Sequence, residues 1–82
     1  MTNLRNDFMG HPIRLLIVDD EAHIRSLLVK ALGLAGYHVE EAASGDEALA
    51  LLERSSYDLM VLDMLMPGMK GPEVLRRARE LK

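Results

Sequence analysis

The run Ile-Arg-Leu-Leu-Ile-Val at residues 13–18 constrains the fold most strongly, because it is almost continuously apolar and stops at two adjacent aspartates, Asp19 and Asp20. Such a run is typical of a strand that is buried on both faces of a parallel sheet. Parallel strands must be joined by long crossover connections, which are usually helices. We therefore expect an α/β fold with this strand at its centre.

Three later segments have the apolar spacing of amphipathic helices, namely residues 21–35, 45–54 and 72–81. Gly36 offers a C-terminal stop for the first helix. Ser44 and Glu47 match a capping box before the second, and Pro72 suits the first turn of the third. The apolar stripe of the first helix consists of Ile24, Leu27, Leu28, Ala31 and Leu32, and that of the third consists of Val74, Leu75, Ala78 and Leu81.

Two shorter segments complete a three-stranded sheet. Residues 59–62 are apolar, whereas residues 37–42 include Glu40 and Glu41, which suit a sheet edge better than a sheet centre. Alternation of strands and helices implies right-handed crossovers and a parallel sheet with helices on both faces. Numbered along the chain, the strands of this (βα)3 unit then take the order 2-1-3.

Asp19, Asp20 and Asp63 are expected to meet in space, although Asp63 is 43 to 44 residues from the other two in the sequence. They follow two strands that are neighbours in the predicted order, and ligands bind beyond the carboxyl ends of parallel strands where the strand order reverses. Neighbouring strands lie only about 4.8 Å apart. Carboxylates this close should share a proton or bind a cation, and oxygen ligands alone favour Mg²⁺.

A simpler interpretation applies to each acid taken singly. Aspartates that end strands often form turns or cap helices, and Asp20 could cap the helix 21–35 in this way. Capping does not require two adjacent acids at one strand end and a third beside them. We therefore favour a functional acidic site.

Two motifs are similar to those of a known family. Leu-Leu-Ile-Val-Asp-Asp-Glu at 15–21 and Asp-Leu-Met-Val-Leu-Asp-Met-Leu-Met-Pro-Gly-Met-Lys-Gly at 58–71 resemble the response-regulator receiver domains of two-component signalling. The resemblance extends from Ile13 to Leu81 and implies a flavodoxin-like parallel sheet, of which the order 2-1-3 would be the first part of 2-1-3-4-5. Residues 1–12 would be a disordered leader and residues 13–82 a partial receiver domain.

The same resemblance implies roles for single residues. Asp63 would accept a phosphoryl group from the phosphohistidine of a sensor histidine kinase. Asp20 would bind Mg²⁺ directly, Asp19 partly through water, and Asp63 and the backbone carbonyl of Leu65 would complete the protein ligands. The acceptor loop would include Pro67, Gly68 and Gly71.

The family pattern continues with a Thr or Ser at the end of a fourth strand and a Lys at the end of a fifth. No residue matches either position, since the only threonine is Thr2 and the lysines are Lys30, Lys70 and Lys82. We therefore expect a fragment or truncated reading frame. The strand 59–62 would then expose an apolar edge that favours self-association or pairing with a complementary chain.

Two other functions stay open beside the phosphoacceptor. A receiver relic that is not phosphorylated could serve as an interaction or dimerisation module, and the missing Thr and Lys favour it. A magnesium-dependent phosphohydrolase also uses an aspartyl nucleophile, but at Asp-x-Asp spacing, whereas Asp19 and Asp20 are adjacent. We expect no enzyme beyond self-phosphorylation and self-dephosphorylation.

The composition limits the kinds of partner and the cellular location that we expect. A net charge of −3 argues against a nucleic-acid surface within these residues, so nucleic acid would be bound only through an output domain. The absence of cysteine suits a reducing cytoplasm, and no apolar run approaches the roughly 20 residues that span a bilayer. His11, His23 and His38 are too scattered to indicate a metal site, and the arginines of 76–79 complement the dipole of their own helix.

Overall fold

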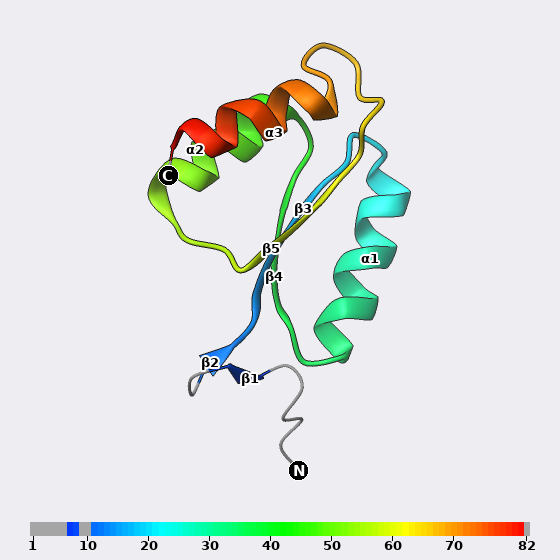
Figure 1. Cartoon of the computed structure of the whole chain (residues 1–82). Helices are drawn as coiled ribbons and strands as arrows, with labels where there is room; N and C mark the ends of the chain where they lie inside the picture. The colour runs from blue at the N-terminus through cyan, green and yellow to red at the C-terminus, as the bar shows by residue number, and fades with distance from the viewer. Residues whose placement is uncertain (1–6, 9–10, 82) are drawn as a thin grey trace.

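The computed structural model describes residues 7–8 and 11–81 of the 82-residue chain (Figure 1). From residue 13 onwards, three strands and three helices alternate in the order that the sequence predicts, and two short strands precede them. In chain order they are β1 Asp7–Phe8, β2 His11–Pro12, β3 Arg14–Val18, α1 Ala22–Leu34, β4 His38–Ala42, α2 Gly45–Arg54, β5 Leu59–Leu62 and α3 Gly71–Glu80.

The main sheet has three parallel strands in the order β4-β3-β5, which confirms the predicted order 2-1-3. The register pairs Leu16 of β3 with Glu40 of β4 on one side and with Met60 of β5 on the other. Helix α1 covers one face of the sheet, and α2 and α3 lie together on the other (Figure 1). The central strand β3 is consequently the most deeply buried element, and Leu16, Ile17 and Val18 are fully inaccessible to solvent.

The main core lies between the sheet and the pair α2 and α3. Val18 of β3, Ala48 of α2 and Val74 of α3 meet there, together with Met66 from the loop after β5. Of the stripe predicted for the last helix, Val74 is buried and Leu75 and Ala78 are half-buried, whereas Leu81 follows the helix end and is 43% exposed. This face therefore has a closed apolar core that includes the start of the loop after Asp63.

The face covered by α1 is more open than helical periodicity predicts. Leu28 and Leu32 are half-buried, but Ile24, Leu27 and Ala31 of the predicted stripe are exposed, with Leu27 at 66%. On the same face, Leu59 and Val61 of β5 are 53% and 42% exposed. Apolar spacing predicts that a helix forms, but it does not specify which of its apolar positions a neighbour covers.

The capping box predicted before α2 forms with one change. The Ser44 hydroxyl accepts the backbone N–H of Glu47 at 3.1 Å, as expected. The Glu47 carboxylate accepts the backbone N–H of Ala43 at 2.6 Å instead of that of Ser44. The start of α2 is thus fixed one residue further back along the chain, close to the end of β4.

The predicted disordered leader 1–12 lies largely outside the described residues. Its described part pairs as the short antiparallel strands β1 and β2, with Asp7 opposite Pro12 and Phe8 opposite His11. This pairing differs from the expected disorder, because a two-residue backbone ladder requires no apolar periodicity. In the described part of the chain, no helix is long and apolar enough to cross a membrane.

Candidate functional site

Backbone hydrogen bonds extend the sheet one residue past its strands and bring two acids together. The N–H of Asp19, which follows β3, donates to the carbonyl of Ala42 in β4 at 3.2 Å. The N–H of Asp63, which follows β5, donates to the carbonyl of Val18 at 2.9 Å. Both residues therefore lie at the carboxyl edge of the sheet, where the sequence places them.

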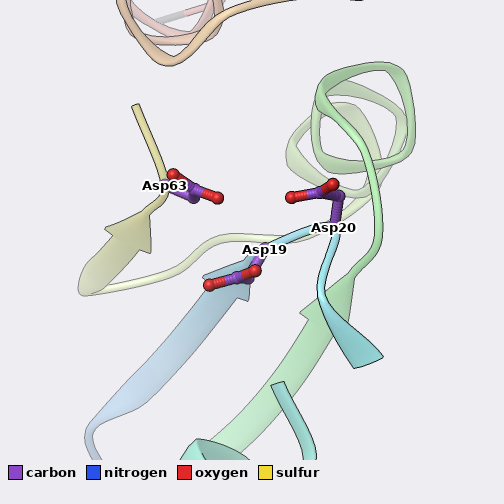
Figure 2. A group of neighbouring side chains, drawn as sticks. All are labelled: Asp19, Asp20 and Asp63. Carbon is purple, nitrogen blue, oxygen red and sulfur yellow. The ribbon is translucent and has the colours of Figure 1, made fainter. Parts of the chain in front are cut away.

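The three aspartates form one acidic cluster. Each of Asp19, Asp20 and Asp63 offers a carboxylate oxygen, and these oxygens all lie within 4.8 Å of one another. In Figure 2 the side chains of Asp20 and Asp63 point toward each other across the gap, and Asp19 lies beside them. Asp20 is exposed, whereas Asp19 and Asp63 are half-buried, so the cluster is open to solvent and to a ligand.

Local hydrogen bonds hold two of the carboxylates. Asp19 Oδ1 accepts the backbone N–H of Glu21 at 2.8 Å, and Asp63 Oδ1 accepts the backbone N–H of Leu65 at 3.0 Å. The N-cap of α1 is Glu21, and no side chain forms a capping hydrogen bond there. The alternative in which Asp20 caps this helix is therefore wrong, and within the described residues the Asp20 carboxylate has no hydrogen-bond or ion-pair partner.

The cluster fits the size of a magnesium site. Ligand oxygens of an octahedral Mg²⁺ ion, each about 2.1 Å from the metal, lie about 3.0 to 4.2 Å apart. The spacing of at most 4.8 Å thus needs only small side-chain rotations or a bridging water. Three carboxylates are also the donor type that Mg²⁺ prefers, and among the described residues this is the only group of three His, Cys, Asp or Glu side chains suited to a metal.

The loop after Asp63 is closed by Gly71. The N–H of Gly71 donates to the carbonyl of Met64 at 3.3 Å. A Cβ at Gly71 would lie 2.5 Å from the Cα of Met64 and 2.9 Å from the carbonyl oxygen of Asp63, so no larger residue fits without a backbone shift. Gly68 adopts a φ of 74°, which glycine allows at little cost. Pro67 is exposed on the same loop.

The Leu65 side chain is 83% exposed, which is consistent with a contribution from its backbone alone. Its N–H holds Asp63, as described above, but the role of its carbonyl as a metal ligand stays a prediction. Met66, the next residue, is only 1% exposed and anchors the loop in the main core. After two exposed residues, Met64 and Leu65, the loop therefore places the Met66 side chain in the core.

Sequence reasoning missed Arg25, which contacts the backbone of the acidic turn. Its Nη1 donates to the carbonyl of Asp19 at 2.8 Å, and its Nε donates to the carboxylate of Glu41 at 2.8 Å. The only available signal was a charged residue inside the apolar periodicity of the helix 21–35. That signal does not reveal either partner, because Glu41 is 16 residues away in the sequence.

A second polar cluster lies away from the acids and joins Arg14, His38, Glu40 and Tyr57. The hydroxyl of Tyr57 donates to Glu40, and this hydrogen bond, with smaller contributions from His38 and Arg14, lowers the pKa of the Glu40 carboxyl below its ordinary value. Burial, and next the Glu40 carboxylate, raise the pKa of Tyr57. The guanidinium of Arg14 also lies 5.5 Å from the centre of the Tyr57 ring. These contacts join β3 and β4 to the segment that precedes β5.

Arg76 and Arg77 of α3 are paired with acids of their own helix. Arg76 pairs with Glu73 at 2.7 Å and with Glu80 at 3.1 Å, and Arg77 pairs with Glu73 at 2.8 Å. The hydrogen bonds from Arg76 and Arg77 lower the pKa of Glu73. These two arginines thus face carboxylates spaced one helical turn away, as expected for a solvated helix surface.

Comparison with known proteins identifies the family. Residues 15–82 match the model of the response regulator receiver domain, and the chain belongs to this family of two-component regulators. It is 49% identical over 69 residues to the transcriptional regulatory protein ResD of Bacillus subtilis, which covers 84% of this chain but 29% of ResD.

Solved structures agree with the fold. The response regulator TrrA of Thermotoga maritima, in complex with Mg²⁺ and BeF, superposes with a TM-score of 0.80 at 44% identity and covers 85% of this chain and 61% of TrrA. TrrA in complex with the histidine kinase ThkA superposes with a TM-score of 0.79 at 44% identity, over 85% of this chain and 60% of that chain. The fold is therefore flavodoxin-like, and the chain spans less than two thirds of the length of these relatives.

Proposed function

We propose that this chain is a phosphoacceptor module in which Asp63 receives a phosphoryl group with the help of Mg²⁺. The observation that supports the proposal is the convergence of Asp19, Asp20 and Asp63 within 4.8 Å at the carboxyl edge of the sheet. Asp19, Asp20, Asp63 and the backbone carbonyl of Leu65 would hold the ion. Pro67, Gly68 and Gly71 would shape the loop that presents Asp63.

The phosphodonor in this proposal is the phosphohistidine of a sensor histidine kinase. A carboxylate oxygen of Asp63 attacks phosphorus, a P–O bond forms, the P–N bond to the histidine breaks, and the leaving imidazole takes a proton from water. Mg²⁺ supplies charge neutralisation on the transferring oxygens. Asp63 keeps its second oxygen for the attack, because Oδ1 is already held by the N–H of Leu65.

The chain is the acceptor in this reaction, and its own contribution to catalysis is positioning. The kinase partner is proposed from the family and from the TrrA relative, which was solved with the histidine kinase ThkA. A cytoplasmic location follows from that partner, and nucleic acid would be reached only through an output domain. The acyl phosphate would add charge near −2 at pH 7 to the crevice.

The test is to incubate the chain with a small-molecule phosphodonor and Mg²⁺ and to measure its intact mass. The wild-type chain should gain one phosphoryl group, and the gain should require Mg²⁺. Asp63→Asn should abolish it, whereas the control Asp46→Asn, an exposed acid in the first turn of α2, should not. A gain that persists in Asp63→Asn, or no gain in the wild type, would contradict the proposal.

A second function rests on the outer edge of β5. Within the described residues β5 pairs only with β3, and Leu59 and Val61 are 53% and 42% exposed. We propose that this edge pairs with a strand of another chain, in the first instance a second copy, which would give an interaction module whether or not Asp63 is phosphorylated.

Light scattering after size-exclusion chromatography tests this pairing. The wild-type chain should elute as a dimer that dissociates on dilution, and Val61→Lys should shift it to a monomer. The control Leu27→Lys changes an exposed apolar residue of α1, which is 66% exposed against 42% for Val61 and lies outside β5. A monodisperse wild-type monomer at high concentration would contradict the pairing and leave the phosphoacceptor proposal intact.

A further inference from the structure

Arg25 joins three elements around the acidic cluster. It lies in the first turns of α1, and its side chain is only 18% exposed. Its guanidinium donates to the carbonyl of Asp19, which precedes α1, and to the carboxylate of Glu41 in β4, both at 2.8 Å. A half-buried guanidinium that binds one backbone carbonyl and one carboxylate fixes the relative position of both.

The carbonyl that Arg25 holds belongs to the peptide between Asp19 and Asp20. The orientation of this peptide sets the direction in which the Asp20 side chain leaves the backbone. The Asp20 carboxylate itself has no hydrogen-bond partner among the described residues, in contrast to Asp19 and Asp63. The placement of Asp20 therefore depends on the backbone, and Arg25 is the side chain that holds that backbone.

We propose that Arg25 is a positioning residue for the metal site, because it locks the Asp19–Asp20 peptide so that the Asp20 carboxylate faces Asp63. This inference rests on the proposed function, since it concerns the same Mg²⁺ ion. Arg25 does not touch the ion in this proposal. It acts only through the peptide and through β4.

The ion pair with Glu41 gives the arrangement a favourable charge balance. A positive charge close to the acidic cluster would oppose the binding of a divalent cation. Because Nε of Arg25 is paired with the Glu41 carboxylate at 2.8 Å, much of the guanidinium charge is offset. Lysine would keep the charge but could not offer two donors in the same fixed plane.

The experiment measures the Mg²⁺ dissociation constant of the folded chain from amide chemical shifts in an NMR titration. Loss of a residue that supports metal ligands typically lowers metal affinity about 10- to 100-fold. We expect about a 10-fold loss for Arg25→Ala and a similar loss for Arg25→Lys, which should fold more readily. Glu41→Gln should cost about threefold, and the control Arg76→Ala, an exposed arginine of α3, should have no effect.

The melting temperature without Mg²⁺ is measured on the same samples to separate positioning from stability. If both Arg25 variants melt earlier but bind Mg²⁺ as tightly as the wild type, Arg25 is only structural and the proposal is overturned. If Arg25→Lys binds Mg²⁺ as tightly as the wild type while Arg25→Ala does not, only the positive charge matters, and the proposal that Arg25 locks the peptide is overturned. If the wild type binds no Mg²⁺, the proposed function itself fails, which is a distinct result.

Discussion

The backbone N–H of Asp63 donates to the carbonyl of Val18 at 2.9 Å, so the proposed acceptor is attached to the strand that leads into the other two acids. Val18 is fully buried, and the carbonyl that receives this bond belongs to the most protected strand of the sheet. The separation of the Asp19 and Asp63 backbones is thus set by strand spacing.

Mg²⁺ should stabilise the chain. A ligand that binds only the folded state at 100 times its dissociation constant adds about 2.7 kcal/mol to the free energy of unfolding. For a domain of this size, that corresponds to roughly 10 °C or more in melting temperature. Asp20→Asn should raise the melting temperature without metal, because it removes repulsion of about 1 kcal/mol at the dielectric constant of water.

Asp20→Asn should also reduce the Mg²⁺-dependent rise in melting temperature to less than half of the wild-type rise. Thermal melts without Mg²⁺ and with Mg²⁺ at about 10 mM measure both effects. Asp46→Asn provides the control, because Asp46 is an acid of α2 outside the cluster. A wild-type melting temperature that ignores Mg²⁺ would contradict the metal site.

Gly71→Ala should destabilise the chain by about 1–3 kcal/mol, because its Cβ would overlap the backbone of Asp63 and Met64. Gly33 provides a control in the last turn of α1, where an added Cβ meets nothing within 4 Å. Gly33→Ala should stabilise the chain by up to about 1 kcal/mol. Urea unfolding measures both changes, and equal effects of the two substitutions would contradict the close packing at Gly71.

Met66→Ala should cost about 2–5 kcal/mol, since Met66 is 1% exposed and fills the core beneath the loop. Leu65→Ala should change the free energy of unfolding by less than about 0.5 kcal/mol, because its side chain is 83% exposed. It should also keep the Mg²⁺ affinity within about twofold, as expected if only the backbone of Leu65 contributes. A large loss of affinity in Leu65→Ala would assign a role to its side chain.

Tyr57→Phe should reduce stability at pH 7 and have a smaller effect at pH 3. The hydrogen bond from Tyr57 lowers the pKa of Glu40 below its ordinary 4.5. The stability gained from the ionised carboxylate is therefore present above pH 4.5 and is lost as the pH falls through the lowered pKa. The expected cost at pH 7 is about 0.5–1 kcal/mol after allowance for solvent screening.

Urea midpoints of the wild type and of Tyr57→Phe at both pH values measure this difference. Tyr37→Phe is the control, because the hydroxyl of Tyr37 has no hydrogen-bond partner among the described residues. A cost of Tyr57→Phe that stays the same at pH 3 would show that lost packing of the ring, and not the bond to Glu40, accounts for it.

Much of the fold was predictable because strand burial and helix capping leave local signals. The apolar run 13–18 predicted the central strand, and Ser44 with Glu47 predicted the start of α2. The convergence of Asp19, Asp20 and Asp63 followed from the strand order alone, because parallel strands end at the same edge.

The rest depends on contacts between residues that no local pattern connects. The exposure of Leu27 depends on which neighbours cover α1, and helical spacing contains no information on that. Arg25 looks like an interruption of an apolar stripe until its bonds to Asp19 and Glu41 are known. The bond of Tyr57 to Glu40 likewise joins positions 17 residues apart, and the two strands concerned, β4, which contains Glu40, and β5, which Tyr57 precedes, lie on opposite sides of β3.

Because a hydrogen bond between Gly71 and Met64 closes the loop, its two ends cannot move independently. Its two ends are fastened to each other, and the second end is also the first residue of α3. The loop therefore cannot deform to accommodate a movement of Asp63, as an open loop could. A displacement of that residue must move the start of α3, and with it Val74, which presses against Gly45 at the start of α2.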